Sequence, residues 1–153
     1  MGASHFTGPL ISGPILNTSG TTLGQDVADW GVVVAGQSQA ITQADTTTAL
    51  ATSIVIPAYS VITSISVIVS TIWASSATLS VGTSATATEL VPATALGTVG
   101  IVNLTPSTAG GAPALLWANT GSSDIRIYVN SSASTGGVGT IIVQYLQAEN
   151  VTT

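Results

Sequence analysis

The stretch ATSIVIPAYSVITSISVIVSTIWA, residues 51–74, decides the class of fold. From residue 60 onward its apolar side chains fall mainly on odd positions, while serines recur on even positions. This alternation has a period of two, which is typical of a β-strand with one face against a core. The apolar odd positions are Val61, Ile65, Val67, Val69 and Trp73.

The even positions of the same run are only partly polar. Ile62, Ile68 and Ile72 share that face with the serines, so we expect part of the second face to be covered as well. A strand over residues 60–73 would be about twice the usual length, which predicts a bulge or a bend near residues 64–66.

Composition favours one all-β domain. The chain has 153 residues, which suffices for a single sizeable core, and 5% are charged against roughly 25% in ordinary soluble proteins. Residues 30–36 read as a strand buried on both faces, Gly36 and Ser38 as a turn, and Ile41 as a core position. Further strands are expected at residues 46–56, 77–82, 88–91, 97–104, 114–119, 124–130 and 140–148. Eight to ten short strands separated by turns predict a jelly-roll-like β-sandwich.

The N-terminal residues follow a different pattern from the rest. Glycines and prolines interrupt residues 1–26, and Pro9 and Pro14 prevent a helix. A disordered terminus is one interpretation, but the segment is rich in large apolar residues, which favours an extended arm that docks on another surface. Those residues are Phe6, Leu10, Ile11, Ile15 and Leu16. We therefore divide the chain into an arm (1–26), a sandwich domain (27–149) and a short tail (150–153).

Charge excludes one large class of partner. Arg126 is the single basic residue against six acidic ones, and the formal net charge is −5. Binding to a phosphate backbone needs many basic contacts, so we expect no nucleic-acid partner. The mean hydropathy of +0.59 reflects short apolar runs that Ser, Thr and Pro57 interrupt, so we expect no membrane span. No cationic region precedes an apolar one at the N-terminus, so no secretory signal is expected.

The residue types that carry catalysis are scarce. His5 is the single histidine, and the chain has no cysteine, which disfavours metal sites and nucleophilic triads. The acids are scattered beside predicted turns, where carboxylates cap and solubilise loops; they are Asp26, Asp29, Asp45, Glu89, Asp124 and Glu149. We therefore predict a protein that is not an enzyme and has no catalytic residues, no metal and no cofactor.

The surface points to self-association. Sheet edges are commonly protected by lysines, and this chain contains none. Arg126 is either a cross-strand partner of an acid or, with Tyr128, part of an interface, where both residue types are enriched. We predict a homo-oligomer, with a trimer as the favoured state. The residues expected at the subunit interface are Ile62, Ile68, Ile72, Arg126, Tyr128, Ile142 and Leu146.

Three runs resemble small structural proteins of tailed bacteriophages. They are IVIPAYSVITSISVIV (54–69), ATLSVGTSATATELV (77–91) and TGGVGTIIVQYL (135–146), and HFTGPLISGPIL (5–16) is similar to the start of many phage virion proteins. The resemblance implies a jelly-roll-like domain that trimerises and decorates or cements a capsid, with its arm on the major capsid protein. It implies a location on the virion surface, and it transfers no individual functional residue.

A tail-fibre or spike head that binds a host receptor or a carbohydrate has the same Ser-, Thr- and Gly-rich composition. The tryptophans separate the two functions. A decoration protein buries them in its core or between subunits, whereas a carbohydrate-binding head places at least one in an open pocket with polar neighbours.

Overall fold

The computed structural model describes residues 33–74, 77–86, 88–106, 112–132 and 136–147. The chain divides into two units, and the larger one comprises Val33–Ala148. The arm of residues 1–26 lies outside the described residues. Eight strands and one helix form the described part: β1 (Val33–Thr42), β2 (Leu50–Ile56), β3 (Ser60–Thr71), β4 (Thr78–Gly82), β5 (Val91–Ala95), β6 (Gly100–Leu104), α1 (Ala112–Ala118), β7 (Ile125–Ser131) and β8 (Val138–Gln147).

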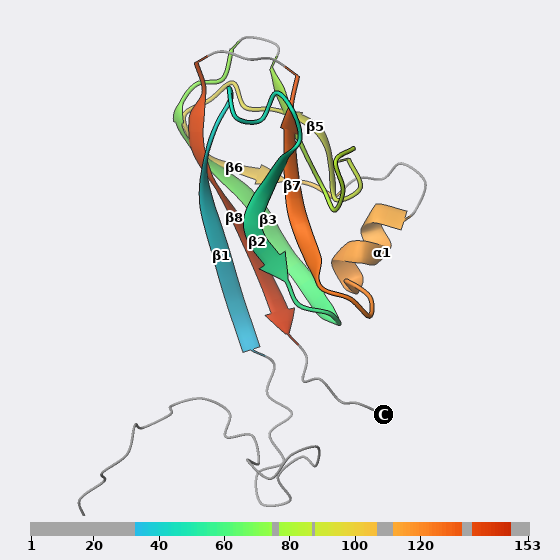
Figure 1. The fold of residues 1–153 in the computed structure, drawn as a ribbon. Helices are drawn as coiled ribbons and strands as arrows, with labels where there is room; N and C mark the ends of the chain where they lie inside the picture. Colours follow the sequence, from blue (N-terminus) through green and yellow to red (C-terminus); the bar gives the residue numbers. More distant parts are fainter. Residues whose placement is uncertain (1–32, 75–76, 87, 107–111, 133–135, 148–153) are drawn as a thin grey trace, which may run out of the picture. The chain divides into compact units, whose positions relative to one another are not determined.

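The strands form two antiparallel four-stranded sheets (Figure 1). The first sheet has the order β1-β8-β3-β6, and the second has the order β2-β7-β4-β5. Strands pair in a nested way, first with last and second with second-last, and successive pairs fall alternately in the two sheets. This arrangement confirms the prediction of an all-β, jelly-roll-like sandwich.

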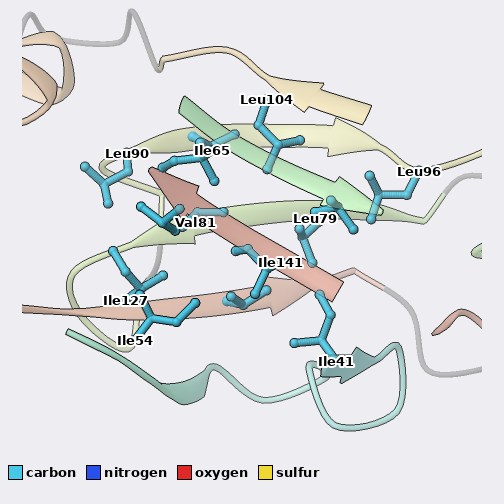
Figure 2. Packing of buried hydrophobic residues seen from close by; sticks show 14 of the residues in the cluster. Ile41, Ile54, Ile65, Leu79, Val81, Leu90, Leu96, Leu104, Ile127 and Ile141 are labelled. Carbon is cyan, nitrogen blue, oxygen red and sulfur yellow. The ribbon is translucent and has the colours of Figure 1, made fainter. Parts of the chain in front are cut away.

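The core lies between the inner faces of the two sheets, where buried aliphatic side chains from both point toward one another (Figure 2). Alternation puts them there, since every second residue of a strand faces the same way. The expected inward positions Ile41, Ile127 and Val129 are all buried, and so are Ile141 and Val143. Burial of an aliphatic side chain stabilises the fold by about 1.5–3 kcal/mol, so these alternating positions supply most of the favourable free energy.

Strand β3 carries the predicted irregularity. The pairing of β3 with β8 shifts register between Ile62 and Ser64, immediately before the span in which a bulge was expected. The extra residue reverses the alternation, so Ile62 is buried in the core upstream of the bulge and Ile65 downstream of it. Ile62 therefore does not share the outward face with Ile68 and Ile72, which corrects its placement at the subunit interface.

Strand β1 differs from the sequence prediction in two ways. It borders the first sheet and has one outward face, on which Val34 is 72% exposed, so it is not buried on both faces. Gly36 and Ser38 lie within the strand, paired with Gln144 and Ile142, and do not form a turn. The β8 ladder overrides the local preference of glycine and serine for turns, because pairing with β8 supplies hydrogen-bond partners for alternate residues along β1.

Two other segments were assigned the wrong structure. Residues 114–119 were expected to form a strand, but Ala112–Ala118 is a short helix. Ala and Leu have high helix propensity, and the short apolar run APALLWA does not by itself distinguish a helix from a strand. The strand expected at residues 88–91 begins only at Val91, because Glu89 belongs to the loop before it, where its carboxylate accepts hydrogen bonds from the Thr83 N–H and the Ser84 hydroxyl.

Glutamines on β1 join the two sheets along one side of the sandwich, where β1 and β2 run side by side (Figure 1). Gln37 donates through Nε2 to the Val55 carbonyl at 2.6 Å, and its Oε1 accepts from the Val55 N–H at 3.0 Å. The Ser53 N–H donates to Gln39 Oε1 at 2.6 Å. These side-chain carboxamides form hydrogen bonds with backbone groups of β2 that a neighbouring strand would otherwise satisfy.

Gly137 gives the first prediction. A Cβ atom at this position would lie 2.4 Å from Cγ of the buried Trp73 ring, so Gly137→Ala should lower the free energy of unfolding by about 1–3 kcal/mol through overpacking. Chemical denaturation measures the change. Gly97→Ala is the matched control, because its Cβ would meet nothing within 4 Å, and it should shift stability by less than about 0.5 kcal/mol. Equal effects of the two changes would contradict the packing argument.

Candidate functional site

The outer face of the first sheet is the most unusual surface of the described protein. None of its four strands contains a charged residue. In the described part of the chain, the charged side chains lie elsewhere: Asp45 in the β1–β2 turn, Glu89 in the β4–β5 loop, and Asp124 and Arg126 at the start of β7. We call this surface the uncharged face. Its outward residues include Val34, Gly36, Ser38, Ala40, Val61, Ser64, Ser66, Ile68, Ile101, Asn103, Val138, Thr140, Ile142, Gln144 and Leu146.

Strand register arranges these residues in rows across the sheet. Ala40, Thr140, Ile68 and Ile101 form one row, and Val34, Leu146 and Val61 form another toward the opposite end. The rows between them are mainly polar, with the Ser64 hydroxyl donating to Gln144 Oε1 at 2.9 Å. The uncharged face thus has an apolar row toward each end and a polar middle.

Exposure of large apolar side chains is concentrated on and beside this face. Ile68 is 41% exposed and Ile101 is 69% exposed, and register places them opposite each other. Val99 directly precedes β6, Ile72 directly follows β3, and both are more than half exposed. Large apolar side chains exposed next to one another, as Ile68 and Ile101 are, favour a protein-interaction site.

The residues predicted at the subunit interface fall on two different surfaces. Ile68, Ile142 and Leu146 lie on the uncharged face, and Ile72 lies beside it. Arg126 and Tyr128 lie on β7 of the second sheet. Sequence reasoning missed Val34 and Ile101, although the alternation that placed Ile68 outward could have placed Ile101, had the register of β6 been known. It also placed Val61 inward with Ile65, and this was wrong, because the bulge before Ser64 turns Val61 outward. The expected capsid-binding residues Phe6, Leu10, Ile11, Ile15 and Leu16 lie outside the described residues.

Arg126 bonds to backbone. Its Nη1 donates to the Thr52 carbonyl at 2.7 Å, at the point where the pairing of β2 with β7 shifts register between Ala51 and Val55. The Thr52 hydroxyl lies in the same irregularity and donates to the Ile127 carbonyl at 2.7 Å. The guanidinium therefore donates a hydrogen bond to a carbonyl in an irregular part of the β2–β7 ladder. This hydrogen bond stabilises the fold.

The acids of the described residues each bond within or beside a turn. Asp45 accepts from the Thr42 hydroxyl, Asp124 accepts from the Ala58 N–H, and Glu89 accepts from the Thr83 N–H and the Ser84 hydroxyl. No group of three or more His, Cys, Asp or Glu residues that could hold a metal ion occurs in the described part of the chain. Over the same residues, no helix is long and apolar enough to cross a membrane.

The tryptophans that the structure describes are enclosed to different degrees. Trp73 is buried in the core, and Trp117 of α1 is half-buried with its Nε1 donating to the Leu90 carbonyl at 3.0 Å. Trp30 lies outside the described residues. The indole N–H of Trp117 is thus used within the fold, where it links α1 to the β4–β5 loop.

No protein-family model matches the chain, and no curated protein matches it. Among solved structures, the chain is similar to one chain of the "Cyanophage Pam1 capsid asymmetric unit", with 18% sequence identity and a TM-score of 0.47. The similarity covers 87% of this chain and 98% of that chain.

Arg126 gives a test of its role. Arg126→Met removes the hydrogen bond to the Thr52 carbonyl but keeps the aliphatic stem, so we expect a loss of about 1 kcal/mol in unfolding free energy. The oligomeric state should stay unchanged, as measured by sedimentation or light scattering. Unchanged stability with a smaller particle would instead make Arg126 an interface residue.

Glu89 makes stability dependent on pH. Burial raises the pKa of this carboxyl, but the hydrogen bonds from Ser84 and from the N–H groups of Thr83 and Thr88 outweigh it and hold the pKa below its ordinary value of 4.5. Its contribution is therefore present above that ordinary value and is lost as the pH falls through the lowered pKa. We expect Glu89→Gln to be less stable than wild type at neutral pH, and the difference to vanish in acid. Unfolding curves of both proteins over this pH range test it, and a constant difference would contradict it.

Proposed function

We propose that this protein is a non-enzymatic structural component of a bacteriophage virion that decorates or cements the capsid as a homo-oligomer. The observation that carries the proposal is the uncharged face, which exposes an apolar row toward each end of a sheet that has no charged residue to protect it. The resemblance of residues 54–69, 77–91 and 135–146 to phage structural proteins supports the virion as the setting.

The absence of charged residues makes the uncharged face a surface on which copies of this chain can meet without electrostatic repulsion. The formal net charge is −5, so two copies repel each other wherever their acidic turns approach. The uncharged face brings together no like charges, and its apolar rows gain from burial. A trimer, as predicted from the sequence, remains the proposed number of copies.

The size of the face suits a specific but modest interface. β1 and β8 have ten residues each, β3 has twelve and β6 has five. At about 3.3 Å per residue and about 4.8 Å between strands they cover roughly 600 Å² per copy. Together with an equal area on a different surface of the neighbouring copy in the trimer, the face would bury roughly 1,200 Å², which is the lower limit for specific protein interfaces. Contacts outside the face would then be needed for a tightly bound assembly.

The N-terminal arm is the proposed contact with the major capsid protein. Residues 1–26 precede the sandwich, and five of their large apolar side chains are grouped between Phe6 and Leu16. A segment of this length can extend over several tens of ångströms, enough to reach a neighbouring protein. The proposed location is the outer surface of the virion.

The described tryptophans do not favour the fibre-head alternative. Such a head needs a tryptophan in an open pocket with polar neighbours, but Trp73 is buried and the N–H of Trp117 is bonded to backbone. The fibre-head function would be supported by adhesion to host cells in the absence of capsid binding.

Ile68→Lys tests the face. A lysine on each copy introduces charge into one of the apolar rows of the proposed contact, so the oligomer should dissociate into folded monomers in sedimentation analysis. Ala51→Lys is the matched control, because Ala51 is an exposed strand residue of the second sheet, and it should leave the oligomer intact. An oligomer of unchanged size in Ile68→Lys would refute the proposed interface.

Binding to capsids tests the setting. Wild-type protein added to undecorated phage capsids should bind stoichiometrically and raise the temperature at which they open. A Leu10→Asp, Ile15→Asp double variant should keep its oligomeric state and lose the binding. Absence of capsid binding together with adhesion to host cells would replace this proposal with the fibre-head function.

A further inference from the structure

Strand β6 is an open edge of the first sheet. It follows β3 at the border of the order β1-β8-β3-β6. Among the described residues, no hydrogen bond joins it to any strand other than β3. In an antiparallel ladder alternate residues direct their N–H and C=O groups to one side, so two or three of the five residues Gly100–Leu104 present these groups outward. β6 contains neither a charged residue nor a proline that would block another strand.

Both borders of the second sheet are blocked, and β1, the other border of the first sheet, lies beside one of them. β1 and β2 are tied together by Gln37 and Gln39, which occupy the backbone groups of Val55 and Ser53. β5 contains Pro92, which has no N–H, and the Thr94 hydroxyl donates to the Pro92 carbonyl at 2.9 Å. The contrast makes β6 the border where a further strand can add.

We propose that β6 pairs antiparallel with β6 of a second copy across a two-fold axis, so that the first sheets of the two copies become one continuous eight-stranded sheet. The sequence GIVNL has five residues with Val102 at its centre. Antiparallel pairing about Val102 places Ile101 opposite Asn103 of the second copy, and Gly100 opposite Leu104. The residues whose N–H and C=O groups point outward are either residues 100, 102 and 104 or residues 101 and 103. In both cases pairing about Val102 places each of these residues opposite a member of the same set in the second copy, so the edge is self-complementary.

The surroundings of β6 favour a second copy of this chain over a different protein. A partner selected by charge would need a charged residue on or beside β6, but residues 97–106 contain none. Val99, Ile101 and Ile68 are exposed beside the edge, and pairing would bring the two sets of apolar side chains together along the seam. The backbone hydrogen bonds of this two-fold contact lie at the edge of the sheet, whereas the proposed oligomer contact lies on its outer face, so the edge can link copies that belong to different oligomers. The inference deepens the proposed function by supplying the link between assemblies.

Cysteine cross-linking tests the register, because the chain has no cysteine of its own. Ile101→Cys and Asn103→Cys are made in separate chains; both positions are exposed, so folding should be unaffected. Directly opposite residues have Cα atoms about 4.5–5.5 Å apart, within the range for a disulfide. Mild oxidation of the mixture should give cross-linked dimers many-fold faster than either variant alone, since neither cysteine faces itself across the axis.

The matched control is the pair Ala93→Cys and Ala95→Cys on β5, which has the same spacing on an exposed but blocked edge. Cross-linking of the β5 pair at the β6 rate, equal rates for single and mixed β6 variants, or no cross-linked dimer would each overturn the inference. As a second measurement, amide hydrogen exchange over residues 100–104 should slow as protein concentration rises; exchange independent of concentration would also overturn it.

The outcome is separable from that of the proposed function, because cross-linking uses purified protein without capsids. If cross-links fail while wild-type protein binds capsids and Ile68→Lys dissociates the oligomer, only the β6 contact is wrong. If cross-links form as expected but capsids are not bound, only the proposed function is wrong.

Discussion

The antiparallel pairing of β3 with β8 is the constraint on which the rest of the protein depends. The two strands are the central pair of the first sheet, and their inward side chains, among them Val67 and Ile141, are completely buried in the core. Because strand side chains alternate, fixing these residues inward fixes Ile68 and Ile142 outward. The surface proposed for assembly is therefore a geometric consequence of the core. The bulge before Ser64 is what makes this consistent over the length of β3, because it lets Ile62 join the core although it shares its parity with Ile68.

The few polar and charged side chains act mainly on the backbone. Gln37 closes the side of the sandwich, and Arg126 bonds to a carbonyl in an irregular part of the β2–β7 ladder. Buried Gln43 accepts from the N–H groups of Ala74 and Gly137, each at 3.1 Å, and so holds two chain segments together. A buried backbone group without a partner costs about as much as a lost hydrogen bond. This chain has few long polar side chains. Those it has form hydrogen bonds with backbone groups that strand pairing leaves without a partner.

Because the few polar and charged side chains are used to bond backbone groups, few charged residues remain for the outer surface. Charge on a sheet face or edge is the usual means of preventing strands of different molecules from pairing. Here the charges of the described residues lie in turns or on the second sheet, and the first sheet is left with serine, threonine, glutamine and aliphatic residues. Such a surface is a liability for a protein that must remain a monomer and an advantage for one whose function is assembly. The uncharged face and the open edge of β6 both result from the lack of charged residues on the first sheet.

The sequence by itself determined the class of fold, the end of β2 at Pro57, and the inward positions of β7 and β8. These are local properties, since alternation and the missing N–H of proline act within a few residues. It also indicated that acids belong to turns, because acids that stand beside predicted strand ends cap them. The tertiary structure decided what depends on pairing partners. Gly36 and Ser38 lie in a strand because β8 supplies their partners, and Ile62 is inward because a bulge consumes one residue. Residues 112–118 form a helix although a short apolar run fits either structure. Which outward residues meet was likewise set by register, and register is a relation between segments far apart in the chain, so no local pattern contains it.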